Sequence, residues 1–260
     1  MTAFNSAARA YARYRPQYPM ALFAGLAEHT GLDGTQTVLD LGCGPGTLTL
    51  PLAALAAHVH AVDIEPAMLA EGRALAAAEG IENVTWTAAD AANLPNLPLP
   101  PLDLCVMGKS FQWMDQPRLL ADLDRLLTPA GTVALISTAA RSTAPRPDWL
   151  DVVETVCKDF LGPDYLQANN PTAHPAEGRD EVLRTSPFSE LRTQIWEQRL
   201  TRTLDELVGL QLSFAHTNPA VLGDRQEAFE QALRDALTAH NPAGAFKSTV
   251  PIEAVFATRP

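Results

Sequence analysis

The sequence predicts an α/β fold built on a doubly wound sheet. The apolar run Thr37–Leu41 breaks into glycines and then into a helical pattern from Thr47, which is the strand–loop–helix layout of a nucleotide-binding turn. An acid, Asp63, ends the next strand about 20 residues after the first, where such folds place a carboxylate on ribose hydroxyls. Further apolar strands alternate with helical patterns, at residues 84–88, 102–107 and 132–137. This alternation indicates parallel strands joined by crossover helices.

The glycine loop favours one class of ligand over another. Segment Asp40–Gly46 reads Asp-Leu-Gly-Cys-Gly-Pro-Gly. Glycines allow backbone angles that a Cβ forbids and let a ligand approach the main chain. A dinucleotide fingerprint requires G-x-G-x-x-G, but here the third glycine comes one residue early, and Asp40 would oppose a pyrophosphate. The loop therefore disfavours a nicotinamide-dependent (NAD) oxidoreductase, which is the first alternative function, and suits a cationic ligand.

The same loop resembles the first motif of class I S-adenosylmethionine-dependent methyltransferases, and Asp63–Leu69 (Asp-Ile-Glu-Pro-Ala-Met-Leu) resembles their second motif. The resemblance is detailed over residues 36–138. It implies a Rossmann-like, seven-stranded doubly wound sheet with the last strand antiparallel and a helical cap, and S-adenosyl-L-methionine as cofactor.

Each matching position has a role in that family. The loop holds the cofactor's amino-acid end, the acid of the second motif binds the ribose, and the residue after it lies against the adenine. An Asp after the third strand accepts from the adenine amino group, although Asp90 suits a helix N-cap equally well. The core residues that we expect to bind the cofactor are Asp40, Gly42, Cys43, Gly44, Asp63, Ile64, Met68, Asp90, Ala91 and Gly108.

The N-terminal segment carries a second resemblance. Residues 11–19 read Tyr-x-x-Tyr-Arg-Pro-x-Tyr-Pro, which is similar to the lid of small-molecule methyltransferases of the trans-aconitate methyltransferase type. Aromatic and basic groups there close over the cofactor's amino-acid end, which implies that Tyr14 and Arg15 bind the cofactor. A surface helix whose tyrosines pack on the main domain explains the same residues equally well.

The loop after the fourth strand is expected to face the methyl donor, because ligands bind beyond the carboxyl ends of strands in open α/β sheets. It lacks the Asn/Asp-Pro-Pro-aromatic string of base-modifying enzymes, and Gln112 stands where many small-molecule members have a His. His216 is the candidate catalytic residue, since a His suits base chemistry near neutral pH, although a lone His is more often structural. The residues expected to line the acceptor site are Lys109, Phe111, Trp113, Tyr165 and His216.

The chain of 260 residues, 47% of them hydrophobic, is expected to form a single methyltransferase domain. Its predicted parts are an N-terminal lid at residues 1–30 and a cofactor-binding core at 36–138. A cap insert that selects the substrate is expected at 139–187, and a C-terminal set of strands and cap helices at 188–260. The sixth and last strands are expected at 188–201 and 250–258.

The composition argues against several kinds of partner. A net charge of −11 and a pI of about 4.9 argue against nucleic acid and anionic membranes. Three widely spaced cysteines and six histidines show no metal spacing, and sparse cysteines without a signal peptide favour the cytoplasm. We therefore predict a cytoplasmic enzyme that methylates a small molecule at a carboxylate, a hydroxyl or an activated carbon. A non-catalytic S-adenosylmethionine-binding protein is the second alternative.

Overall fold

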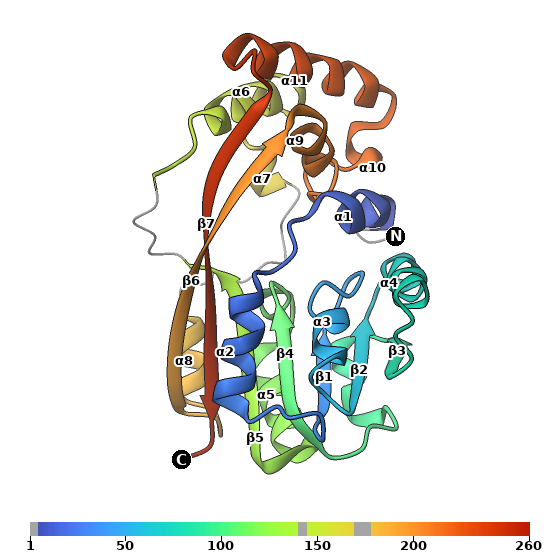
Figure 1. Cartoon of the computed structure of the whole chain (residues 1–260), viewed down its shortest axis with the longest axis vertical. Coiled ribbons are helices and arrows are strands. Elements are labelled where there is room, and N and C mark those ends of the chain that lie inside the picture. The colour runs from blue at the N-terminus through green and yellow to red at the C-terminus, as the bar shows by residue number, and fades with distance from the viewer. Residues whose placement is uncertain (1–4, 140–144, 169–177) are drawn as a thin grey trace. The chain divides into compact units, whose positions relative to one another are not determined.

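The computed structural model describes residues 5–139, 145–168 and 178–260. The chain divides into two compact units (Figure 1). We call residues 17–140, 173–196 and 252–260 the sheet unit, and residues 1–16, 141–172 and 197–251 the helical unit. The predicted N-terminal lid is thus divided at Pro16. Parts of the predicted cap insert, at 140–144 and 169–177, lie outside the described residues.

A seven-stranded sheet has the order β3-β2-β1-β4-β5-β7-β6. Strands β1 to β5 pair in parallel, and β7 runs antiparallel to β5, with Leu135 opposite Val255. The strands are β1 Thr37–Leu41, β2 His58–Asp63, β3 Val84–Ala88, β4 Leu102–Gly108, β5 Leu127–Thr138, β6 Glu190–Thr203 and β7 Ala245–Thr258. This order confirms the predicted fold. Strands β2 and β3 are added on one side of β1, and β4 and β5 on the other. Ligands of open α/β sheets bind at such a switch point, here between β1 and β4.

Helices of the sheet unit begin and end at recognisable signals. In α4, Pro66 occupies the first turn, and Gly80 ends the helix with a left-handed φ of 69°. In α5, the Asp115 carboxylate accepts from the Arg118 N–H at 3.3 Å, and the apolar face is buried. The helices are α2 Met20–Thr30, α3 Thr49–Ala53, α4 Pro66–Glu79, η2 Ala91–Asn96, η3 Phe111–Trp113, α5 Gln116–Leu126 and α8 Arg179–Arg184.

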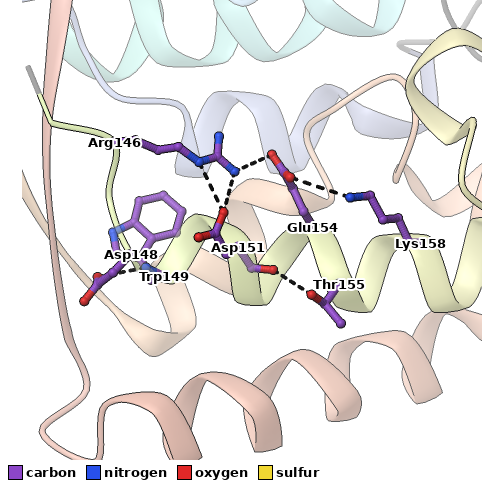
Figure 2. Close-up of polar contacts among 7 residues, drawn as sticks. All are labelled: Arg146, Asp148, Trp149, Asp151, Glu154, Thr155 and Lys158. Atoms are coloured by element: carbon purple, nitrogen blue, oxygen red, sulfur yellow. Dashed lines mark hydrogen bonds and ion pairs between the residues drawn. The ribbon is translucent and has the colours of Figure 1, made fainter. Parts of the chain in front are cut away.

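The helical unit has its own core, which includes Trp149, Phe229 and Phe246. The Trp149 indole N–H donates to the Lys247 carbonyl at 2.9 Å. Figure 2 shows the exposed face of α6, where the Arg146 guanidinium contacts Asp151 at 2.8 Å and Glu154 at 2.7 Å. The helices are η1 Asn5–Ala7, α1 Ala8–Tyr14, α6 Trp149–Leu161, α7 Tyr165–Ala168, α9 Leu204–Gln211, α10 Pro219–Leu222, η4 Gly223–Arg225 and α11 Gln226–His240.

Three local features shape these helices and strands. The helix after the glycine loop is the short α3. Segment 219–240 is broken at Gly223, whose φ of 54° no α-helix accommodates. Residues 129–131 lie inside β5, where the pairing with β4 shifts its register. Within the described ranges, no helix combines the length and apolar character needed to cross a bilayer.

Candidate functional site

The glycine loop at the end of β1 is fixed by β2. The N–H groups of Gly42 and Cys43 both donate to the Val62 carbonyl, at 2.7 and 3.1 Å. Gly42 has a φ of 71°, and a Cβ on it would overlap the side chain of Ser110. Ser110 itself donates from its hydroxyl to the Leu41 carbonyl at 2.6 Å. A side chain at position 42 is therefore excluded twice, by backbone angle and by space.

Asp40 is a buried carboxylate below this loop, with 1% of its surface exposed. Its Oδ2 accepts from the Thr49 hydroxyl at 2.6 Å. Burial, with a smaller contribution from the charge of Asp63, raises the pKa of Asp40 to about 7, while the hydrogen bond from Thr49 opposes the shift. Among the described residues, neither Asp40 Oδ1 nor Oε1 of the buried Glu65 has a hydrogen-bond partner. Two buried, unsatisfied carboxylate oxygens fit a ligand that brings positive charge or hydrogen-bond donors.

Asp63 ends β2 and binds backbone groups on both sides. Its Oδ2 accepts from the Gly44 N–H at 2.7 Å, and its Oδ1 accepts from the Glu65 N–H at 2.8 Å. Burial raises the pKa of Asp63, while these N–H donors oppose the shift. Each carboxylate oxygen has two lone pairs, so the side chain can accept further bonds from vicinal hydroxyls. The next residue, Ile64, leaves 52% of its surface exposed and offers an apolar contact beside them.

Three other predicted cofactor residues have structural contacts of their own. Asp90 caps η2, with its Oδ1 accepting from the Ala92 N–H at 2.8 Å, so the capping alternative is observed, and adenine binding by Asp90 and Ala91 stays a prediction. Met68 is buried within α4. Gly108 ends β4, and a Cβ there would lie 3.1 Å from the Tyr18 hydroxyl.

The loop after β4 combines a strained residue with a buried one. Lys109 has a φ of 58°, which is uncommon for a residue with a side chain, and the Gln112 amide donates to its carbonyl at 2.9 Å. Phe111 lies in the core cluster of the sheet unit. Trp113 is half-buried in η3. Core packing is the observed role of Phe111, and acceptor contact by Lys109, Phe111 and Trp113 stays a prediction.

The remaining predicted residues lie in the helical unit. The Tyr14 ring packs against Gly209, where an added Cβ would overlap it. The Arg15 guanidinium lies 4.8 Å from the Tyr11 ring centroid and 4.0 Å from that of Phe214, and it donates to the Ser213 carbonyl at 3.2 Å. These are cation–π contacts on two aromatic rings.

His216 continues the same cluster. It stacks on Phe214 with centroids 5.2 Å apart and meets Tyr165 edge-on at 5.2 Å. Burial, together with the positive charge of Arg15, lowers the pKa of His216 to about 4, so its imidazole is neutral at pH 7. Burial raises the pKa of Tyr165 to about 12. The structure thus brings Arg15, Tyr165 and His216 into one aromatic cluster.

Two positions that sequence reasoning missed support the loop. Ser110 closes the space above Gly42, as described. The Trp86 ring on β3 packs against Gly46 and Gly72, where an added Cβ would lie 2.7 and 2.5 Å from it. The sequence signal for this contact is a large aromatic residue on β3, which follows two segments that each carry a glycine, Gly46 and Gly72. Within the described part of the chain, no group of three or more His, Cys, Asp or Glu side chains could hold a metal ion.

Comparisons with known proteins agree with this geometry. Residues 38–131 match a family model described as a methyltransferase domain. A protein of Mycobacterium tuberculosis named as an uncharacterized methyltransferase is 29% identical over 222 residues, which cover 84% of this chain and 79% of that protein. Trans-aconitate 2-methyltransferase of Escherichia coli is 36% identical over 107 residues, 40% of each chain.

A solved structure of a methyltransferase-named protein from Anaeromyxobacter dehalogenans has a TM-score of 0.63 and 25% identity, and the match covers 95% of this chain and 98% of that one. With the observed sheet order and glycine loop, these matches support a class I S-adenosylmethionine-dependent methyltransferase. It is therefore an enzyme of methyl transfer.

Proposed function

We propose that the protein binds S-adenosyl-L-methionine at the glycine loop and transfers its methyl group to a small-molecule acceptor. The observation that carries this proposal is the pairing of Asp63, anchored to the loop through Gly44, with the exposed Ile64. A carboxylate beside an exposed apolar side chain suits a ribose joined to an adenine. The unsatisfied oxygens of Asp40 and Glu65 suit the positive charge of the same ligand.

Each part of the site has an assigned task. Asp40, Gly42, Cys43 and Gly44 would hold the amino-acid end of the cofactor, because the glycines let it approach the main chain closely and Asp40 supplies a buried acid. Asp63 would hold the ribose hydroxyls. The residues that would contact the adenine are Ile64, Met68, Asp90 and Ala91.

When bound, S-adenosylmethionine supplies an electrophilic methyl group on a sulfonium centre. The protein's share is to align the acceptor with that methyl and to exclude water. Gly108, Lys109 and Trp113 end or follow β4 at the carboxyl edge of the sheet, where they would fulfil this role. Trp113 would add an apolar wall that favours a sulfonium charge.

The acceptor is a carboxylate, a hydroxyl or an activated carbon. A neutral His216 with a pKa of about 4 is a weak base, so an acceptor that is already ionised needs the least from it. The acidic composition supports a small molecule over nucleic acid. The trans-aconitate 2-methyltransferase relative supports a small acceptor as well. A cytoplasmic location is proposed with this function.

Turnover distinguishes an enzyme from a protein that only binds the cofactor. S-adenosylhomocysteine formation would be followed by mass spectrometry with a dicarboxylate, a catechol and a β-dicarbonyl compound as acceptors. The expected result is product with at least one class and a loss of about tenfold or more in Trp113→Ala, with S-adenosylhomocysteine affinity unchanged. Binding of S-adenosylmethionine with no turnover on any class would contradict the proposal.

A further inference from the structure

Thr49 and Asp40 form a buried pair where the glycine loop joins β1 to α3. The Thr49 hydroxyl donates to Oδ2 of Asp40 at 2.6 Å, and the two residues expose only 0% and 1% of their surfaces. The other carboxylate oxygen, Oδ1, is enclosed and has no hydrogen-bond partner among the described residues. A buried carboxylate that uses one of its two oxygens has lost hydration that the fold does not replace. The pair is therefore incomplete without a donor for Oδ1.

The position of Thr49 follows from the course of the loop. Gly46 has a φ of 87°, and its carbonyl accepts from the Leu50 N–H at 2.9 Å, which fixes the start of the helix. Thr49 is the first residue of α3 and lies nine residues after Asp40. The strand–loop–helix turn thus returns this hydroxyl to the strand that carries the acid. Thr49 supports the site although it is not among the residues predicted to bind the cofactor.

The ionisable groups that act on Asp40 come from three neighbouring elements. They are Asp63 at the end of β2, Cys43 in the loop and Cys105 on β4, while α3 carries no ionisable side chain. Burial raises the pKa of both thiols, so they are neutral at pH 7, and Asp63 is the neighbour that adds charge. Burial raises the pKa of Asp40 to about 7, and the hydrogen bond from Thr49 is the main effect that opposes this shift. The hydroxyl therefore favours the ionised carboxylate.

We propose that Thr49 is a positioning residue of the cofactor site: its hydroxyl holds the Asp40 carboxylate through Oδ2 and leaves Oδ1 to accept a hydrogen bond from the bound cofactor. This inference rests on the proposed binding of S-adenosyl-L-methionine at the loop. In protonated Asp40 the proton lies on Oδ1, because Oδ2 accepts from Thr49, and Oδ1 is then a donor. Binding therefore requires the ionised acid, whose proton goes to solvent. The ammonium group of the ligand is a donor of suitable charge.

Calorimetry of S-adenosylhomocysteine binding to the full chain, at about pH 6, 7 and 8, tests this role. Thr49→Val removes the hydroxyl and keeps the shape of the side chain, whereas Thr49→Ser keeps the hydroxyl. Thr132→Val is the matched control, because Thr132 on β5 is 4% exposed and lies opposite Leu104, in the amino-terminal half of β4. Asp40→Asn removes the acid, and its combination with Thr49→Val completes a double-mutant cycle.

Thr49→Val should weaken binding by about tenfold at pH 7, as expected for a lost hydrogen bond to a charged group, while Thr49→Ser should stay within about threefold of the wild type. Thr132→Val should bind as the wild type does. Wild-type affinity should fall by about tenfold from pH 8 to pH 6, because protonation below a pKa of about 7 removes the acceptor. Asp40→Asn should lose this pH dependence, and adding Thr49→Val should then change affinity by less than about threefold.

Unchanged affinity in Thr49→Val, an equal loss in Thr132→Val, or no restoration by Thr49→Ser would overturn the proposal. So would a full loss from Thr49→Val in the Asp40→Asn background, because Thr49 would then act without Asp40. If Thr49→Val does not fold, the pH profiles still decide, since an identical profile in the wild type and Asp40→Asn contradicts the role of Oδ1. If S-adenosylhomocysteine does not bind the wild type at any pH, the proposed function itself fails.

Discussion

The glycine loop of the sheet unit and the arginine cluster of the helical unit have opposite charge. Around the loop, Asp40, Asp63 and Glu65 present carboxylates whose pKa is raised by burial. In the helical unit, Arg15 and Arg202 present guanidinium groups. The first region suits a cation with hydroxyl groups.

The two regions also differ in how they are held. The loop is fixed by backbone hydrogen bonds to the next strand, such as those of Gly42 and Cys43 to Val62. The arginine cluster is held largely by stacking, with Arg15 on Phe214 and Phe214 on His216. A loop held by backbone hydrogen bonds can adapt little to a substitution, whereas stacked side chains can change rotamer. We therefore expect substitutions in the loop to cost more than similar ones in the cluster.

The largest expected effect is that of Gly42→Ala. It should lower the free energy of unfolding by about 2–5 kcal/mol, because a left-handed backbone and an overlap with Ser110 both oppose the methyl group. Gly44→Ala is the control for backbone strain alone, since its φ is 55° and no atom crowds its Cβ position. Gly209→Ala should cost less than Gly42→Ala, because the Tyr14 ring can move. Urea unfolding of the three variants measures these differences, and equal losses for positions 42 and 44 would contradict the account.

Asp63→Ala comes next and acts on ligand binding. It should weaken S-adenosylhomocysteine by about 2–4 kcal/mol, as expected for the loss of charge-assisted hydrogen bonds to two hydroxyls. The variant also leaves the N–H groups of Gly44 and Glu65 without their acceptor, so the apo protein should lose about 1 kcal/mol as well. Asp63→Asn is the control that retains one acceptor oxygen. A loss of stability as large as the loss of binding would make Asp63 a structural residue.

The third effect is a pH dependence that Asp40 imposes. Its pKa is raised from 3.8 to about 7, so between these values the folded protein binds more protons than the unfolded chain. Its contribution to stability is complete below about pH 4 and is lost as the pH rises to about 7. The slope reaches at most about 1.4 kcal/mol per pH unit. Asp40→Asn should flatten this slope in urea unfolding between those pH values, and an unchanged slope would show that Asp40 ionises normally.

The smallest effect belongs to the ion pairs on α6 in Figure 2. Arg146 and Asp151 are exposed and Glu154 is partly exposed, so water and salt screen their attraction. Arg146→Gln should leave the melting temperature unchanged within error. Arg179→Gln is the contrasting variant in the sheet unit, because its 2.7 Å pair with Glu253 is well shielded and should matter measurably. A larger loss for Arg146→Gln than for Arg179→Gln would reverse this comparison.

The difference between the regions also explains what the sequence could predict. The Asp63–Gly44 contact joins residues 19 apart, within one strand–helix–strand unit whose geometry is set by spacing. The motifs, through the family that they resemble, therefore predicted the doubly wound sheet and its antiparallel last strand. Phe111 illustrates a limit: its position after β4 did not predict that it packs in the core, and its contact with the acceptor stays a prediction.

Contacts across long stretches of chain were beyond the sequence. Arg15 reaches Ser213, 198 residues away, and Trp149 reaches Lys247, 98 residues away. Neither periodicity nor spacing in the sequence predicts such long-range contacts. The sequence also did not indicate that Arg202 is buried, because arginines on strands of alternating polarity are usually exposed. The catalytic role of His216 stays a prediction, and its low pKa depends on burial and on Arg15, which only the folded chain brings together.

The central claim is that the carboxylate-lined glycine loop binds S-adenosylmethionine-type ligands and not a nicotinamide dinucleotide. Titration calorimetry with S-adenosylhomocysteine and with NADH tests this claim most directly. The account predicts saturable binding of S-adenosylhomocysteine, with a dissociation constant on the order of micromolar, and no heat of binding from NADH. Tight binding of NADH with no response to S-adenosylhomocysteine would contradict it.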